Sequence, residues 1–286
     1  MGIRTFDNAR VLIVGGSSGI GRSAALEAAA RGAIVWVAGH EPDAVQETIR
    51  ALRRVSDKGH GGVCMDVRET ETVEDGCARA AEAMGGLDIV VCCSGFALTG
   101  DCMELGEGDF LSLMDVNYMG HVRVVRAVTP LLREQGAGHI TLVSSILGFF
   151  STYGYGAYSA SKYAIVGFAE GLRQDLLEDG ISVGVFFPPT TRTPGLDLEN
   201  ETKSELLWQL ESDNNITKTY DVEPVAAALL EQVRAGSFEG LVGRDSTFVR
   251  TVTRLFPRLS RILADRELLA AVRKVRARGL LQRAAH

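Results

Sequence analysis

Short apolar segments alternate with longer amphipathic segments along residues 9–187 of the chain. The short segments have the length of buried strands, and the longer ones have the apolar spacing of helices. Strands are predicted at 9–15, 33–38, 62–65, 87–93, 139–144 and 181–187. Helices are predicted between them, at 19–31, 43–55, 70–84, 109–134 and 157–179. This alternation predicts an α/β fold in which a parallel sheet carries helices on both faces.

The chain after 187 completes the predicted sheet and adds two further segments. A helix at 221–236 and a short strand near 241–242 would bring the sheet to about seven strands. Residues 195–220 are polar, acidic and weakly periodic, which favours either a mobile helical lid over a substrate or an ordinary surface insertion. We therefore expect one domain over 1–247 with this lid, followed by a separate tail over 248–286.

The tail differs from the rest of the chain in charge. Residues 249–286 contain ten Lys or Arg and two acids, a balance of +8, whereas the whole chain carries −6 and the remainder therefore −14. Apolar residues at 248, 252, 255, 259 and 262 keep helical spacing, and Pro257 predicts a kink. A basic amphipathic helix favours an anionic membrane surface. The open alternative is that the tail docks on its own acidic body or on a second subunit.

Composition excludes several classes of protein. The 286 residues are 46% apolar, enough for one full core, but no apolar run reaches the length of a membrane span. The N-terminus does not resemble a signal peptide, and the five cysteines form no C-x-x-C pair, so we expect reduced thiols in the cytoplasm. The five histidines lack metal-ligand spacing, so no metal is expected. The acidic body argues against nucleic-acid binding.

A glycine-rich loop follows the first predicted strand. The apolar run Val11–Val14 leads directly into Gly15-Gly-Ser-Ser-Gly-Ile-Gly21, and an Ala-rich helix follows. In a strand-to-helix turn, glycines let backbone N–H groups approach a pyrophosphate at the positive end of the helix dipole. The pattern predicts a dinucleotide-binding loop whose contacting residues are Gly15, Ser17, Ser18, Gly19, Ile20 and Gly21.

A second motif carries candidate proton-transfer chemistry. Ser145 precedes Tyr158 and Lys162, and the Tyr-x-x-x-Lys spacing places a phenol and an ammonium on one helix face. A nearby cation favours the phenolate and would lower the pKa of the tyrosine toward neutrality. With the Ser145 hydroxyl, this pair could protonate an alkoxide as it forms from a ketone. Gly15, Ser145 and Pro188 all fall at carboxyl ends of predicted strands, where such folds bind ligands.

The two motifs together resemble the short-chain dehydrogenase/reductase family over about residues 8–243. Asn117 matches the asparagine of the family's central helix, whereas Val14 replaces a threonine and 92–95 reads Cys-Cys-Ser-Gly instead of Asn-Asn-Ala-Gly. The resemblance implies a Rossmann-type doubly wound sheet, a nicotinamide cofactor and a homodimer or homotetramer formed through 109–134 and 157–179. It implies the catalytic residues Asn117, Ser145, Tyr158 and Lys162, with Asn117 holding a water that relays protons to Lys162.

The end of the second predicted strand bears on cofactor choice. It reads Ala-Gly-His40-Glu41, without the acid that ends this strand in many NAD enzymes, so NADPH is favoured over NADH. His40 stands where related reductases have an arginine for the 2′-phosphate. By the same resemblance, Asp66 would meet the adenine amino group. The remaining expected cofactor contacts are Val67, Gly95, Tyr158, Lys162, Pro188, Thr191 and Thr193.

A narrower resemblance concerns the substrate. Pro188-Pro189 and the run Glu-Asn-x-Thr-Lys at 199–203 are similar to the 3-ketodihydrosphingosine reductases, which implies reduction of a 3-keto lipid. These relatives have Asp at the positions of Thr190 and Arg192. Arg192 would suit an anionic substrate, so a 3-oxoacyl or general carbonyl reductase stays an alternative, as does a non-catalytic lipid- or partner-binding protein. Ser145, Tyr155 and Arg192 are the expected substrate contacts.

Overall fold

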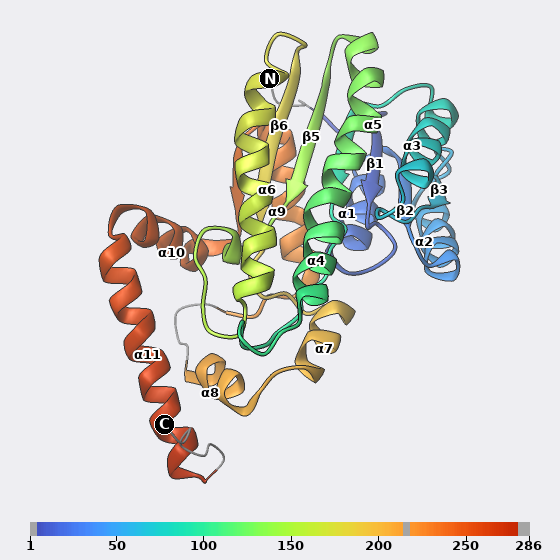
Figure 1. The fold of residues 1–286 in the computed structure, drawn as a ribbon. Coiled ribbons are helices and arrows are strands. Elements are labelled where there is room, and N and C mark those ends of the chain that lie inside the picture. The colour runs from blue at the N-terminus through green and yellow to red at the C-terminus, as the bar shows by residue number, and fades with distance from the viewer. Residues whose placement is uncertain (1–4, 214–217, 280–286) are drawn as a thin grey trace.

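The computed structural model describes residues 5–213 and 218–279, and a seven-stranded parallel sheet runs through its centre (Figure 1). Strand order is β3-β2-β1-β4-β5-β6-β7, the doubly wound arrangement that the sequence predicts. The chain order reverses direction between β1 and β4. The strands are β1 Arg10–Val14, β2 Ile34–Gly39, β3 Gly61–Cys64, β4 Ile89–Cys92, β5 Gly138–Val143, β6 Ile181–Phe187 and β7 Glu239–Leu241.

Helices cover both faces of the sheet (Figure 1). One face is packed by α3, α5 and α6, and the other by α1, α2 and α9. These helices are α1 Gly19–Ala30, α2 Pro42–Val55, α3 Thr70–Met84, α5 Gly120–Gln135, α6 Gly156–Asp175 and α9 Val222–Ala235.

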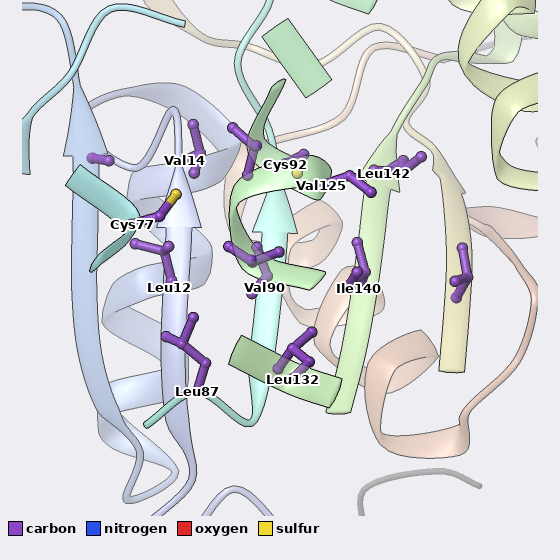
Figure 2. Close-up of a cluster of buried hydrophobic side chains, with 14 of the residues drawn as sticks. Leu12, Val14, Cys77, Leu87, Val90, Cys92, Val125, Leu132, Ile140 and Leu142 are labelled. Carbon is purple, nitrogen blue, oxygen red and sulfur yellow. The ribbon is translucent and has the colours of Figure 1, made fainter. Parts of the chain in front are cut away.

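Alternation along each strand divides the core into two layers. In β1, Leu12 and Val14 face the α3–α5–α6 layer, while Val11 and Ile13 face the α1–α2–α9 layer, because successive side chains point to opposite faces. Figure 2 shows Leu12 and Val14 beside Val90 and Cys92 of β4 and beside side chains of the covering helices. Since both faces are covered, the central strands are continuously apolar rather than alternating.

The predicted helix at 109–134 is interrupted in the structure. It consists of α4 Glu107–Met114, a π-helical turn Asp115–Met119, and α5. The wider turn holds Asn117, which is fully buried. Such π-turns are rare and concentrate at functional sites.

The described part of the predicted lid contains two helices, α7 Pro194–Glu201 and α8 Glu205–Asp213. Between 243 and 279 the chain forms two more, α10 Gly243–Leu255 and α11 Pro257–Ala277, and the break between them falls at Pro257, where a kink is predicted. Figure 1 shows α11 extending away from the sheet and passing beside α8. None of the helices within 5–213 and 218–279 is long and apolar enough to cross a membrane.

The tail packs on the lid, in line with the alternative that the basic tail docks on its own chain. Ala271 and Val275 of α11 are buried in a small apolar cluster with Leu207 and Leu210 of α8 and with Tyr155. Intramolecular docking therefore accounts for one face of α11. The apolar row predicted from spacing lies elsewhere. Four of its residues are exposed, namely Phe248, Leu255, Leu259 and Ile262, and Val252 is partly buried.

Candidate active site

A cavity of about 830 Å³ opens at the carboxyl ends of the central strands, beneath the lid and α11. Parallel α/β sheets bind ligands at this edge, where the strand order reverses. Most of the predicted site residues line its wall. They are Gly15, Ser17, Ser18, Gly19, Ile20, Gly21, His40, Asp66, Val67, Gly95, Ser145, Tyr155, Tyr158, Lys162, Pro188, Thr191 and Thr193.

The glycine loop has the shape that a pyrophosphate requires. Gly15 has φ +77°, and a Cβ there would lie 2.5 Å from the backbone nitrogen of Ser94. A Cβ on Gly21 would collide with the carbonyl oxygen of Gly15, and one on Gly39 with the Ser17 hydroxyl. The loop thus presents bare backbone at the start of α1, where N–H groups and the helix dipole favour an anion. These residues fit a dinucleotide cofactor.

Ser145 and Tyr158 meet on one side of the cavity. Ser145 follows β5, is 8% exposed, and its hydroxyl accepts a hydrogen bond from the backbone N–H of Leu147 at 3.1 Å. Burial raises the pKa of Tyr158 above that of a free phenol, while a side-chain hydrogen bond with Ser145 lowers it and the negative charge of Glu199 raises it further. At neutral pH the phenol is therefore protonated and can act as a proton donor.

Lys162 corrects one expectation. Its Nζ lies 5.7 Å from the centre of the Tyr158 ring and donates a hydrogen bond to the carbonyl oxygen of Val143 at 3.2 Å. Burial lowers the pKa of Lys162 to about 8. The pKa of Tyr158 is not lowered toward neutrality as expected, because burial of the phenol, the largest effect, outweighs the influence of an ammonium that is hydrogen-bonded to a backbone carbonyl.

Asn117 does not line the cavity, unlike the other three predicted catalytic residues. Its Oδ1 accepts a hydrogen bond from the backbone N–H of Phe96 at 2.9 Å, and its Nδ2 donates to Ser161 Oγ at 2.9 Å. A Cβ on Gly95 would lie 2.9 Å from Asn117 Oδ1 and 3.2 Å from Lys162 Nζ. Asn117 therefore holds the loop after β4 against α6, next to the Lys162 ammonium.

The predicted adenosine end carries a charge that sequence reasoning missed. Asp66 pairs with Arg68, whose Nη2 lies 2.5 Å from Asp66 Oδ2. The side-chain hydrogen bond from Arg68 lowers the pKa of Asp66 to about 2. Arg68 and His40 both line the cavity, and the His40 side chain is 69% exposed with its Nε2 3.5 Å from Glu41. The only signal for Arg68 was its position two residues beyond Asp66.

The structure does not place the Arg192 side chain in the cavity where a substrate contact is predicted. Its Nη1 lies 2.7 Å from Asp221 Oδ1, both side chains are more than 60% exposed, and Arg192 is absent from the cavity wall. Its backbone N–H bonds to the carbonyl oxygen of Tyr220, in a bridge between Thr191 and Tyr220 that directs the side chain to the pairing with Asp221. Thr191 instead is buried in the wall.

The lid contributes a cluster of charges that sequence reasoning only partly anticipated. The Tyr155 hydroxyl lies 2.5 Å from Glu199 Oε1 and 2.7 Å from Glu211 Oε1. Lys203 Nζ lies 3.0 Å from Glu199 Oε1 and 2.9 Å from Glu211 Oε2, and its side chain is 2% exposed. We call Tyr155, Glu199, Lys203 and Glu211 the lid cluster. Glu199 and Lys203 are spaced as helical neighbours, but nothing local in the sequence indicates Glu211.

No group of three or more His, Cys, Asp or Glu within the described ranges is arranged to hold a metal ion.

Comparison with known proteins agrees with this geometry. Residues 9–204 match the family model described as short chain dehydrogenase. The chain belongs to this family. A 3-ketodihydrosphingosine reductase of Mus musculus is 33% identical over 250 residues, which cover 86% of this chain and 74% of that protein, and one of Bos taurus is 32% identical over the same lengths. This short-chain dehydrogenase is an NAD(P)-dependent oxidoreductase, and the predicted resemblance to 3-ketodihydrosphingosine reductases is confirmed.

Solved structures share the fold. A short-chain dehydrogenase/reductase of Burkholderia phymatum, in complex with NAD, has a TM-score of 0.78 at 24% identity and covers 90% of this chain and 96% of its own. A short-chain dehydrogenase of Burkholderia cenocepacia J2315, in complex with NADP, has a TM-score of 0.74 at 19% identity, over 91% and 98% of the two chains. At these identities the likeness concerns the fold, and it confirms the predicted class.

Proposed function

We propose that this short-chain dehydrogenase reduces 3-ketodihydrosphingosine to dihydrosphingosine, with NADPH as hydride donor and Tyr158 as proton donor. The observation that carries the proposal is the 32–33% identity to curated 3-ketodihydrosphingosine reductases over 86% of the chain, joined to a cavity that gathers Ser145, Tyr158 and Lys162. The alternative of an anionic 3-oxoacyl substrate depended on Arg192 facing the cavity. Arg192 does not line it, so no observation favours that substrate.

A nicotinamide cofactor held by the glycine loop would supply the hydride in this reaction. Ser145 and Tyr158 hydrogen-bond the carbonyl oxygen, and Tyr158 transfers its hydroxyl proton to that oxygen as negative charge develops. The raised pKa of Tyr158 keeps this proton in place until the oxygen becomes basic enough to take it. Lys162 stabilises the phenolate that remains, and Asn117 keeps the loop beside Lys162 in position.

NADPH is supported by the residues at the end of β2. No carboxylate from this strand end lines the cavity, whereas His40 and Arg68 do. Arg68 pairs with Asp66 in the structure, and a 2′-phosphate would offer its guanidinium a second, doubly charged partner.

The proposal is tested by following NADPH oxidation with purified protein. We expect turnover with 3-ketodihydrosphingosine, a higher kcat/KM with NADPH than with NADH, and a lower kcat/KM with a 3-oxoacyl thioester. A protein that consumes neither cofactor with the ketosphingoid base, while reducing the thioester, would refute the assignment.

The rate of ketone reduction should fall as pH rises through the pKa of Lys162, about 8. The ammonium stabilises the developing phenolate, and its charged fraction drops about tenfold between pH 7 and pH 9. We expect kcat/KM to drop about tenfold over the same range. Burial lowers the pKa of Lys162 from 10.5, so the unfolded chain binds the proton more tightly than the folded protein does. Deprotonation of Lys162 therefore raises the free energy of unfolding as pH rises between about 8 and 10.5. The expected fall in kcat/KM cannot then be caused by Lys162 unfolding the protein.

The check is a pH profile of kcat/KM for wild type and Lys162→Met. The variant should be slower at pH 7 and should lose the inflection near pH 8. An inflection that persists in the variant would assign the titration to another group.

We also propose that the protein is cytoplasmic and binds anionic membrane surfaces through α10 and α11. The support is exposed apolar residues beside exposed arginines that include Arg258 and Arg261, on α10 and on α11, of which α11 packs its other face on the lid. The exposed apolar residues are the four exposed members of the predicted row, Phe248, Leu255, Leu259 and Ile262, together with Phe256, Leu263 and Leu269. We further propose a homodimer or homotetramer through α4 and α5 on one side and α6 on the other, where Leu111 is 61% and Tyr163 45% exposed. A monomer in sedimentation at micromolar concentration would contradict either oligomer.

Replacing Arg258 and Arg261 with Gln should weaken binding to vesicles of phosphatidylcholine and phosphatidylserine by about thirtyfold, since each basic residue near an anionic surface contributes about 1 kcal/mol. Co-sedimentation measures this. The matched control replaces Arg53 and Arg54, which are exposed on α2, and should bind like wild type. Equal binding to pure phosphatidylcholine vesicles would exclude the electrostatic part of the proposal.

Truncation after residue 247 would not test the membrane contact by itself. Ala264 and Glu267 of α11 line the cavity, and Ala271 and Val275 pack on α8. Loss of α11 would therefore disturb the lid together with any membrane contact.

A further inference from the structure

The lid cluster places one hydroxyl proton, that of Tyr155, between two carboxylates that could each accept it. The Tyr155 hydroxyl has a single proton, yet it lies within hydrogen-bond distance of two carboxylates, those of Glu199 and Glu211. Lys203 supplies donors to both carboxylates. No described residue donates to the second oxygen of Glu199. The second oxygen of Glu199 is therefore available to a further donor from a ligand or from water.

The cluster is also short of one positive charge. With its groups ionised, Glu199 and Glu211 carry two negative charges and Lys203 carries one positive charge. The Lys203 side chain is 2% exposed, that of Glu199 15% and that of Glu211 35%, so water screens the charge of Glu199 more weakly than that of Glu211. Lys218 also lines the cavity, but it is exposed, and its charge is screened by solvent. A buried excess of negative charge is stabilised by a cationic ligand.

The cluster lies within the cavity already described, close to the proton donor. The ring centres of Tyr155 and Tyr158 are 6.3 Å apart, and Glu199 and Glu211 both belong to the cavity wall. The negative charge of Glu199 also contributes to the raised pKa of Tyr158. Apolar side chains of the lid continue the same wall and suit an alkyl chain: Leu196, Leu198, Leu207 and Leu210.

These observations describe a ligand with three parts: an oxygen at Tyr158, a cation next to it, and an alkyl chain. We infer that Glu199 and Glu211 are the residues that select a ketone bearing an ammonium group near its carbonyl, an inference that rests on the proposed function. The substrate ammonium donates N–H hydrogen bonds to carboxylate oxygens of the cluster. Its positive charge balances the one negative charge that Lys203 does not neutralise. Neutral ketones leave the excess charge unbalanced and are reduced less efficiently.

The test compares two ketones that differ only in the amine. The kcat/KM values are measured for 3-ketodihydrosphingosine and for its des-amino analogue, with wild type, Glu199→Gln and Glu211→Gln. We expect wild type to prefer the amino ketone. Each variant should lose about tenfold to a hundredfold more kcat/KM on the amino ketone than on the analogue, so the preference for the amine should shrink or vanish.

The matched control is Glu201→Gln, an exposed residue of α7 that does not line the cavity and should keep the wild-type preference. A binding measurement keeps the inference testable where a variant folds poorly. By calorimetry, wild type should bind dihydrosphingosine at least tenfold more tightly than its N-acetyl derivative, which has no charge.

The outcomes separate the inference from the proposed function. Equal kcat/KM for the two ketones in wild type, with equal binding of the two alcohols, would overturn the inference and leave ketone reduction standing. Equal losses on both ketones in the Glu199 and Glu211 variants would overturn it too, because the cluster would then only hold the lid in place. Tight, amine-dependent binding without any turnover would support the cluster's role and refute the proposed function.

Discussion

Tyr158→Phe should lower kcat/KM for ketone reduction at least a hundredfold. The substitution keeps the aromatic ring and removes only the hydroxyl that would donate a proton to the developing alkoxide, a contribution of about 10² to 10⁴ in rate. The hydroxyl hydrogen-bonds Ser145, so its loss leaves the Ser145 side chain with its backbone donor alone. Steady-state NADPH oxidation measures the loss, and thermal unfolding should change little because the ring packing stays.

The control for this variant is Tyr153→Phe. Tyr153 packs against the same apolar cluster of lid and tail but does not line the cavity, so its hydroxyl should be dispensable. Turnover near wild type in Tyr158→Phe, or an equal loss in both variants, would remove Tyr158 from the role of proton donor.

Much of the fold follows from local patterns. The run Val11–Val14 predicts a buried strand because all four residues are apolar, and the structure buries each of them, two in each core layer. Helix α3 occupies 70–84, the range predicted from apolar spacing, and α1 begins at the glycine loop as expected. The glycine loop could be predicted for the same reason, since its function depends on backbone conformation at adjacent residues.

The parts that the sequence did not predict depend on contacts between distant segments. The π-turn around Asn117 is fixed by hydrogen bonds to Phe96 and Ser161, which lie on other elements, so periodicity gives no sign of it. The orientation of Arg192 is decided by Asp221, far along the chain. The expected shift of the Tyr158 pKa failed because the burial of a phenol is a tertiary property that a Tyr-x-x-x-Lys spacing does not contain.

For the lid and the tail, local patterns likewise predict the helices but not how the helices pack on one another. Helical character could be predicted for both, and the break at Pro257 as well. Their packing on one another could not, because the small residues Ala271 and Val275 that meet α8 stand outside the apolar row that the spacing emphasised. One face of α11 lines the cavity and packs on α8, so only the exposed apolar residues on its other face remain available for the proposed membrane contact.

Gly21→Ala should impair the enzyme about as severely as loss of the proton donor, by a different route. The added Cβ would collide with the carbonyl oxygen of Gly15, a backbone atom of the same loop that cannot move aside as a side chain would. Overpacking of this kind costs about 1–3 kcal/mol of folding stability. The loop must also shift the N–H groups that would cradle the pyrophosphate, so we expect the Kd for NADPH to rise at least tenfold and kcat/KM to fall about a hundredfold.

Fluorescence titration with NADPH and thermal unfolding measure the two effects separately. Gly108→Ala is the matched control: this exposed glycine at the start of α4 has no neighbouring atom within 4 Å of an added Cβ. It should bind NADPH like wild type and gain up to about 1 kcal/mol, since alanine is the better helix former. If Gly21→Ala loses stability but binds NADPH with unchanged affinity, the glycine at 21 serves the packing of α1 on the strand, and the cofactor's phosphates bind elsewhere in the cavity.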